Sequence, residues 1–223
     1  MTTTSHQLQA TDAVGSDTSQ QFDVPLQVAN EFPVSSVYNA FLSERGGTQI
    51  STANTLFWGK PLYPTSGTTY FTTTEFEAAA NNANPGDVIF LGDGTYPQDS
   101  MTITANGQQF NPIIIASANI HGANLSGAKI TVNGNYVLVM GFTETYYECN
   151  GDDVTVAYAY YDGGGSTGPW FIADGQRNRL CYSTFTNRTV GGQYFSVVST
   201  TPIPQYARID HNHFLNHWGP TGA

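Results

Sequence analysis

The stretch Asn84-Pro-Gly-Asp-Val-Ile-Phe-Leu-Gly-Asp-Gly-Thr-Tyr96 marks the point where the chain changes character. It holds one short apolar run, Val88 to Leu91, between two turn signals. Pro85-Gly86 leads the chain into the run, and Gly92-Asp93-Gly94 leads it out again. A segment of small residues precedes the stretch, and short apolar runs follow it. We therefore expect the boundary between a helical cap and a repeating β body to fall here.

Short apolar runs recur after this stretch, separated by Gly, Asn, Asp or Pro. Examples are Met101–Ile103, Ile113–Ala116, Val137–Met140 and Leu180–Tyr182. Three longer stretches also resemble one another, namely Asn135–Phe142, Asn178–Phe185 and Tyr206–Phe214. A period of about 20–30 residues with several short strands in each period is typical of a solenoid. We predict an all-β protein folded as a right-handed parallel β-helix, with a β-sandwich as the alternative.

The region before the β body divides into three parts. Residues 1–21 are rich in Thr, Ser, Gln and Asp, and we expect a flexible arm. Residues 22–66 hold too few apolar residues for a core of their own, so this N-terminal extension should pack on the body or on a neighbouring chain. Residues 72–82 have the pattern of one short helix, capped by Thr73 or Thr74. This helix should cap the β-helix that we predict for residues 67–223.

Charge and composition limit the partners. Only 11% of the residues are charged, and Thr, Ser, Asn, Gly and Tyr replace them, which favours turns and strand surfaces. The net charge of −10 argues against binding to nucleic acid. No apolar run reaches the length of about 18 residues needed to span a membrane. The N-terminus has no pattern of a cleavable signal. We expect an extracellular location reached by another route, or a virion surface; a cytoplasmic location stays open.

The two cysteines, Cys149 and Cys181, do not form a disulfide framework. We expect two buried thiols that pack as small apolar groups, although one bridge between them is possible.

Five pieces of the chain resemble a known family. Pro85–Tyr96 resembles the opening coil of the alginate lyase and chondroitinase B family of polysaccharide lyases. The pieces Asn111–Ser117, Gly134–Phe142, Asn178–Phe185 and Arg208–Phe214 resemble later coils in the same order. The resemblance covers residues 68 to 217. It implies a β-helix with a long groove for an acidic polysaccharide.

The resemblance also implies a chemistry. In this family a calcium ion neutralises a uronate carboxylate, a Lys removes the C5 proton and an Arg assists the leaving group. The family's asparagine calcium ligand would fall at Val190, or at Asn187 in a shifted register. The remaining ligands, the catalytic Lys and the catalytic Arg would lie beyond Phe214, and neither Lys60 nor Lys129 stands at a matching place. We therefore expect a chain truncated before the catalytic coils, with no complete catalytic set.

Four arginines in the last part of the chain are candidates for binding acidic sugar: Arg177, Arg179, Arg188 and Arg208. Arg188 is the first choice because it aligns with a basic groove position of the family. The alternative is that these side chains form ion pairs with Asp174 and Asp210. His211 and His213, two residues apart on a strand, are weaker candidates for a metal ion, together with Asn187.

Two functions remain open at this stage. The first is a structural or adhesive β-helix derived from the lyase fold, which self-assembles, for example into a filament, or belongs to a virion or extracellular surface. An open end of a β-helix offers unpaired backbone groups to another chain. Such a protein would also bind acidic polysaccharide. The alternative is a lyase that cleaves alginate or chondroitin by β-elimination. We expect no cofactor other than the calcium ion that the resemblance allows.

Overall fold

The structure is a computed structural model, and it describes residues 60–97, 100–109, 111–163, 169–189, 195–197 and 207–216. All of them belong to one compact unit, which begins at Ile50. The predicted flexible arm and the predicted extension up to residue 59 lie outside the described residues. No helix in the described part is long and apolar enough to cross a membrane.

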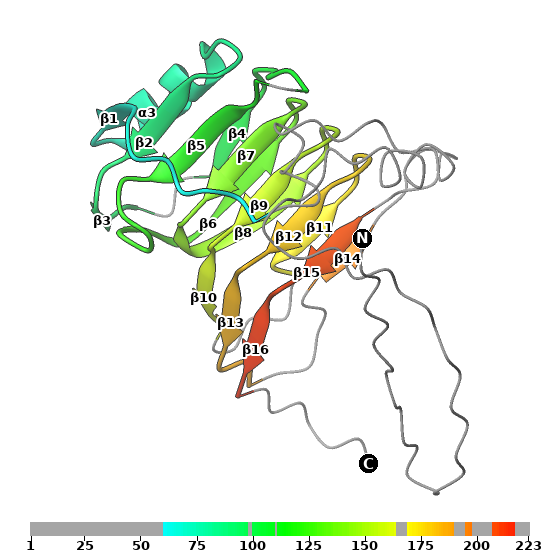
Figure 1. Ribbon diagram of the computed structural model, residues 1–223. Helices are drawn as coiled ribbons and strands as arrows, with labels where there is room; N and C mark the ends of the chain where they lie inside the picture. The colour runs from blue at the N-terminus through cyan, green and yellow to red at the C-terminus, as the bar shows by residue number, and fades with distance from the viewer. Residues whose placement is uncertain are drawn as a thin grey trace, which may run out of the picture. The chain divides into compact units, whose positions relative to one another are not determined.

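The described chain alternates between two parallel sheets. Sheet A contains β1 (Thr68–Tyr70), β2 (Val88–Leu91), β5 (Ile113–Ser117), β7 (Val137–Met140), β9 (Thr155–Ala157), β12 (Arg179–Cys181) and β15 (Arg208–Asp210), in this spatial order. Sheet B contains β3 (Gly94–Thr95), β4 (Met101–Ile103), β6 (Ala123–Val132), β8 (Thr143–Cys149), β10 (Tyr160–Asp162), β11 (Phe171–Ala173), β13 (Thr184–Thr186), β14 (Phe195–Val197) and β16 (His213–Leu215). Figure 1 shows the sheet A strands lying side by side in chain order.

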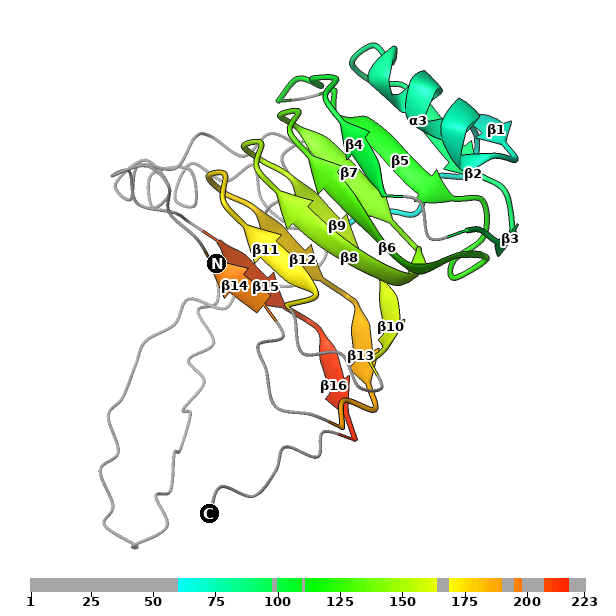
Figure 2. The same ribbon diagram turned by 180° about the vertical axis from the view of Figure 1, so that it is seen from behind.

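Sheet B is folded into two faces. The first halves of β6 and β8 pair on one face, where β8 also pairs with β10, β10 with β13, and β13 with β16. Their second halves pair on another face, where β8 also pairs with β11, and β11 with β14. Figure 2 shows β8, β11 and β14 side by side, and β10, β13 and β16 apart from them. Each coil of the chain therefore contributes to three faces, and coils stack by parallel pairing. Every pairing between named strands is parallel, so the described residues contradict an antiparallel sandwich.

Apolar columns run through the stack because equivalent residues of successive coils pair in register. One column of sheet A points into the core and consists of Ile89, Ile115, Val139, Val156, Leu180 and Ile209. Successive residues of a strand point to opposite faces, so the residues between these point outward. The middle strands of sheet A are buried on both sides, as shown by β7 and β9, whose residues are all buried. This explains why they appear in the sequence as unbroken apolar runs rather than as alternating patterns.

The predicted helix is present as α3 (Thr73–Asn81). Thr72 is its N-cap and accepts a hydrogen bond from the Glu75 backbone N–H, so the predicted caps Thr73 and Thr74 are wrong by one or two residues. Asn81 bonds the Thr102 carbonyl and the Thr104 N–H at 2.9 and 2.7 Å, and the Glu77 carboxylate accepts from the Thr102 N–H at 2.7 Å. These side chains occupy the edge of β4, which would otherwise offer unpaired backbone groups.

Residues 60–67, which we call the strap, cross the outer face of sheet A before the chain enters β1. Figure 1 shows the strap in cyan against the strands of sheet A. The Tyr158 hydroxyl donates to the Pro61 carbonyl at 2.7 Å, and the Tyr63 hydroxyl donates to the Ser117 carbonyl at 2.6 Å. The strap therefore accounts for part of the apolar cover over sheet A, and this part of the predicted extension packs on the body of its own chain.

Candidate functional site

The outer face of sheet A changes from apolar to charged along the stack. Its apolar part contains Phe90, Ala116, Leu138, Met140 and Ala157, all buried under the strap and neighbouring loops. At β12 and β15 the same outward positions hold Arg179, Arg208 and Asp210 instead. Charged side chains are rarely buried unless they are paired, so this end of the face is a natural place to look for a function.

Asp210 is the centre of an ionic cluster. Arg179 donates to it through two nitrogens, Nε to Oδ1 at 2.8 Å and Nη2 to Oδ2 at 2.7 Å, a bidentate arrangement. The Nε of Arg208 lies 3.1 Å from the same Oδ1, and the Nδ1 of His211 lies 2.6 Å from Oδ2. Arg179 is fully buried, whereas the Arg208 and His211 side chains are 26% and 55% exposed. Arg179 thus fixes the cluster, and the other two groups face solvent.

The electrostatics favour an ionised Asp210. Burial by itself would raise the pKa of this carboxyl group. Hydrogen bonds from Arg179 and His211, with the positive charges of Arg179 and Arg208, outweigh burial and lower the pKa. The carboxylate therefore stays charged and holds both guanidinium groups in place.

Aromatic rings stack beside this cluster, at the corner where sheet A turns into sheet B. The rings of Tyr158 and Tyr182 lie 5.8 Å apart and those of Tyr182 and His211 lie 4.7 Å apart, both in stacked geometry. The backbone explains the alignment, because all three residues follow a sheet A strand and have φ between 51° and 55°. From the strap, the Lys60 ammonium group lies 5.6 Å from the centre of the Tyr182 ring.

We call this group of residues the cationic corner: Lys60, Tyr158, Arg179, Tyr182, Arg208, Asp210 and His211. It combines the basic side chains of Lys60, Arg179 and Arg208 with one carboxylate, in a protein whose net charge is −10. Arginine is suited to bind carboxylates, and aromatic faces are suited to stack on the apolar side of a sugar ring. The corner therefore has the chemistry to hold an acidic sugar.

The structure brings together Arg179, Arg208 and His211 of the predicted site residues and separates the rest. Arg177 lies ahead of β12 rather than after it, and binds both carboxylate oxygens of Asp153 at 2.8 and 2.6 Å. Arg188 is buried, with its guanidinium carbon 5.1 Å from the centre of the Trp170 ring. The expected ion pairing was therefore right for Asp210 and did not anticipate Asp153. Sugar binding by the four arginines stays a prediction.

The weaker metal candidates lie apart from one another. His211 belongs to the corner, whereas His213 is in β16 on another face, so the assumption that both share one strand face is wrong. Asn187 donates to Asp162 at 3.1 Å and accepts from Asn216 at 3.2 Å. The described residues include no group of three or more His, Cys, Asp or Glu side chains that could hold a metal ion.

Sequence reasoning did not predict that Lys60, Tyr158 and Tyr182 belong to the corner. Tyr182 and His211 each stand three residues before the phenylalanine that ends their repeats, Phe185 and Phe214, and this common position was the available signal. Nothing in the sequence pointed to Lys60, because it reaches the corner only through the path of the strap. Cys149 and Cys181 are free buried thiols, as expected, on the inner and outer sides of the sheets respectively.

Comparisons with known proteins agree with this architecture. Residues 71–159 match the family model of chondroitinase B. A PL6 family alginate lyase, AlyGC, superposes with a TM-score of 0.57 at 19% identity, covering 66% of this chain and 23% of that one. An alginate lyase from Paenibacillus sp. str. FPU-7 gives a TM-score of 0.50 at 22% identity, covering 66% of this chain and 57% of that one. The search of curated proteins found no match.

This chain thus spans less than two thirds of the length of either lyase. The matched segment runs from the residue after β1 to the loop after β9, so it contains α3 and the first coils of the stack. Residues 71–159 are thus similar in sequence to chondroitinase B, and the fold of the chain is similar to that of the PL6 alginate lyases.

Proposed function

We propose that this protein is a right-handed parallel β-helix, capped by α3, that binds an acidic polysaccharide at the cationic corner. The fold proposal is supported by three-faced coils that stack by parallel pairing. The binding proposal depends on one observation: Arg208, His211 and Lys60 gather on an exposed corner beside stacked tyrosine rings. Alginate, the substrate named for both similar lyases, is a chain of uronate sugars and has the required carboxylates.

The geometry suggests a role for each group. Arg208 and Lys60 offer charged donors to a uronate carboxylate, while the buried Arg179 positions Asp210 and thereby Arg208. Tyr182 and His211 offer ring surfaces at the same corner. Because this corner lies near solvent, its binding should weaken with added salt, as exposed ionic contacts do.

Binding to alginate, measured by calorimetry at low salt, tests the proposal. Arg208→Ala should weaken binding about tenfold, the equivalent of about 1.4 kcal/mol. Lys60→Ala should act in the same direction, and Lys129→Ala is its matched control. Lys129 is the other lysine of the chain and pairs with Glu148 across two sheet B strands. Equal affinity in all three variants and the parent protein would remove the corner as the binding site.

Catalysis is a proposal of its own, which the family relationship supports. In a β-elimination, a base removes the C5 proton of a uronate, the bond between C4 and the glycosidic oxygen breaks, and a C4–C5 double bond forms while the leaving oxygen gains a proton. The unsaturated product absorbs ultraviolet light. Incubation with alginate and with chondroitin should therefore show rising absorbance if the protein is a lyase. If the absorbance stays constant while the protein still binds alginate, the protein binds the polysaccharide without cleaving it.

A structural or adhesive role is the second candidate, and a specific feature favours it. Four large apolar side chains of the last described strands of sheet B are exposed: Phe195, Val197, Phe214 and Leu215. In the described chain, β14 pairs only with β11, and β16 pairs only with β13. We propose that this edge packs against another subunit in an extracellular or virion assembly. Light scattering should then show an oligomer, and Phe214→Glu should dissociate it; a monomer at all concentrations would exclude this role.

A further inference from the structure

The cationic corner contains one side chain of the type that changes its charge between pH 5 and 8, which is His211. Imidazole ordinarily titrates within this range, whereas lysine, arginine, tyrosine and aspartate side chains ordinarily titrate outside it. The His211 side chain is 55% exposed, so a proton and a ligand can both reach it. The corner therefore combines a fixed set of charges with one group whose charge depends on pH.

Asp210 determines which nitrogen of the His211 ring carries the proton. Burial raises the pKa of the Asp210 carboxyl group, but the donors and positive charges around it lower this pKa overall, so the group is ionised and only accepts hydrogen bonds. The Nδ1 of His211, 2.6 Å from Oδ2, therefore donates. In the neutral ring Nε2 is then the nitrogen without a proton. A fall in pH protonates Nε2 and converts it from an acceptor into a donor.

The surroundings of the ring hold it in place and supply the fixed charges. Tyr182 stacks on His211 with ring centres 4.7 Å apart, and Asp210 holds the edge of the ring at Nδ1. The charged and titratable groups around this stack come from β12, β15, the strap and the ends of two sheet A strands, and they are Lys60, Tyr158, Arg179, Tyr182, Arg208 and Asp210. Three basic side chains thus share one carboxylate, and a protonated imidazole adds a further positive charge that attracts an anionic ligand.

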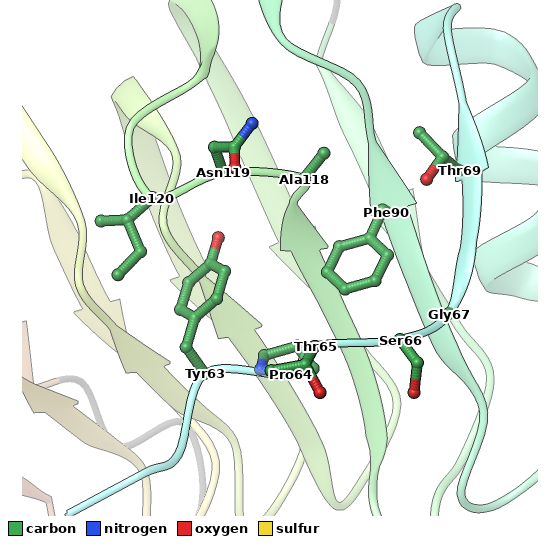
Figure 3. Close-up of a pocket in the computed structure, with 10 residues that line it drawn as sticks. All are labelled: Tyr63, Pro64, Thr65, Ser66, Gly67, Thr69, Phe90, Ala118, Asn119 and Ile120. Atoms are coloured by element: carbon green, nitrogen blue, oxygen red, sulfur yellow. The ribbon is translucent and has the colours of Figure 1, made fainter.

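Lys60 belongs to the fixed charges because the strap is anchored. Figure 3 shows the strap from Gly67 to Tyr63, where it crosses the strands of sheet A beside Phe90. The Tyr63 hydroxyl donates to the Ser117 carbonyl, and further along the strap the Tyr158 hydroxyl donates to the Pro61 carbonyl at 2.7 Å. The second bond fixes the backbone next to Lys60, at the corner itself.

A uronate carboxylate distinguishes the two forms of the His211 ring. Carboxyl groups have ordinary pKa values near 4, so a uronate stays charged between pH 5 and 8. The protonated ring offers it a charge-assisted hydrogen bond from Nε2. The neutral ring presents a lone pair at the same atom, which repels a carboxylate oxygen. The affinity of the corner for an acidic sugar should therefore depend on pH.

We propose that His211 is a sugar-binding residue of the cationic corner whose protonated form donates from Nε2 to a uronate carboxylate, so that the protein binds acidic polysaccharide more tightly at about pH 5.5 than at about pH 8. This inference rests on the proposed function and adds a dependence on pH to it. Protonation of the ring and binding of the polysaccharide favour each other, so binding takes up protons from solution.

Calorimetry with alginate at low salt, at about pH 5.5 and about pH 8, tests the proposal. The parent protein should bind about threefold more tightly at the lower pH, an effect of the size that an exposed ion pair supplies. Titrations near pH 6.5 in two buffers with different enthalpies of ionisation should also show proton uptake on binding. A residue that only supports the fold would change the affinity without changing this uptake.

His211→Tyr is the decisive variant. It introduces the residue that the two preceding coils have at this position, Tyr158 and Tyr182, whose φ values of 55° and 51° match the 55° of His211. The variant keeps an aromatic ring for the stack and loses the titrating group. It should bind alginate equally at both pH values and take up no protons. His213→Gln removes the exposed imidazole of β16, is the matched control, and should keep the pH dependence of the parent protein.

Three results would overturn the proposal while alginate still binds: equal affinity of the parent protein at both pH values, tighter binding at about pH 8, or a pH dependence that persists in His211→Tyr. Loss of the dependence in His121→Gln would also overturn it, since the Nε2 of His121 lies 2.9 Å from the carbonyl oxygen of Tyr158. Thermal unfolding checks that the variants fold. An absence of alginate binding at both pH values would instead remove the proposed function, together with this inference.

Discussion

The outer face of sheet A has two regions that share one backbone geometry and differ in chemistry. In β5 and β7 the outward side chains are apolar and covered, whereas in β12 and β15 two arginines and an aspartate take the same positions. Both regions stack in parallel register, so strand geometry does not distinguish them. This difference shows that the side chains at outward positions decide whether a coil forms part of a second core or of a charged site.

Removal of Asp210 should have the largest effect on this comparison. Asp210→Ala leaves the fully buried Arg179 without the carboxylate that holds it, and breaking a buried ion pair in this way costs about 3–5 kcal/mol. Urea unfolding measures the loss. The double variant Arg179→Met/Asp210→Leu should recover most of it, because it converts the charged region into an apolar one. A loss below 1 kcal/mol in the single variant would contradict the pairing.

Leu138→Ala tests the apolar region. If the outer face is a second core, truncation of this side chain, which is 2% exposed, should cost about 2–4 kcal/mol. The inner Val139→Ala is the matched control from the same strand, and both should be destabilised. A loss confined to Val139→Ala, again by urea unfolding, would mean that the outer face is open to water.

Gly141→Ala tests how tightly the strap joins the two regions. Gly141 has φ +76°, and an added Cβ would approach the Tyr63 hydroxyl oxygen to 2.3 Å. The variant should lose about 1–3 kcal/mol through backbone strain and displacement of Tyr63. Gly151→Ala is not a suitable control, since its Cβ would strike the Gly134 carbonyl. Tyr63→Phe, which removes only the bond to Ser117, is the milder comparison and should cost about 1 kcal/mol.

The smallest effect concerns pH. The pKa of Asp210 is lower in the folded protein than its ordinary value, so its stabilisation is present above the ordinary aspartate pKa of about 4 and is lost as pH falls through the folded value. Below about pH 4, the parent protein should therefore lose stability relative to the double variant Arg179→Met/Asp210→Leu, which has no carboxyl group at this position. Denaturant unfolding at several pH values measures it, and a difference that does not change with pH would contradict the lowered pKa.

The sequence predicted strands better than it predicted the site. The runs Val88–Leu91, Met101–Ile103 and Val137–Met140 are strands with those bounds. In Val88–Leu91 and Val137–Met140, burial on both faces leaves an unbroken apolar run, whereas Met101–Ile103 alternates around the exposed Thr102. The length of β6 could not be predicted from the sequence, because Ser126 at φ 51° and Gly127 at φ 84° interrupt the first half of this strand. The site was harder, since Arg177 and Arg179 are two residues apart and pair with carboxylates of different coils.

The sequence by itself determined that the chain stacks short strands after a capped helix, and that it resembles the polysaccharide lyases. Local turn residues and apolar runs carry that information, because each strand and corner depends on its own few residues. Only the tertiary structure decided that Arg179, Arg208 and His211 meet while Arg177 and Arg188 do not, and that the strap brings Lys60 to Tyr182. Such contacts depend on the number of residues in each coil and on the path of the strap, which join residues that no local pattern relates.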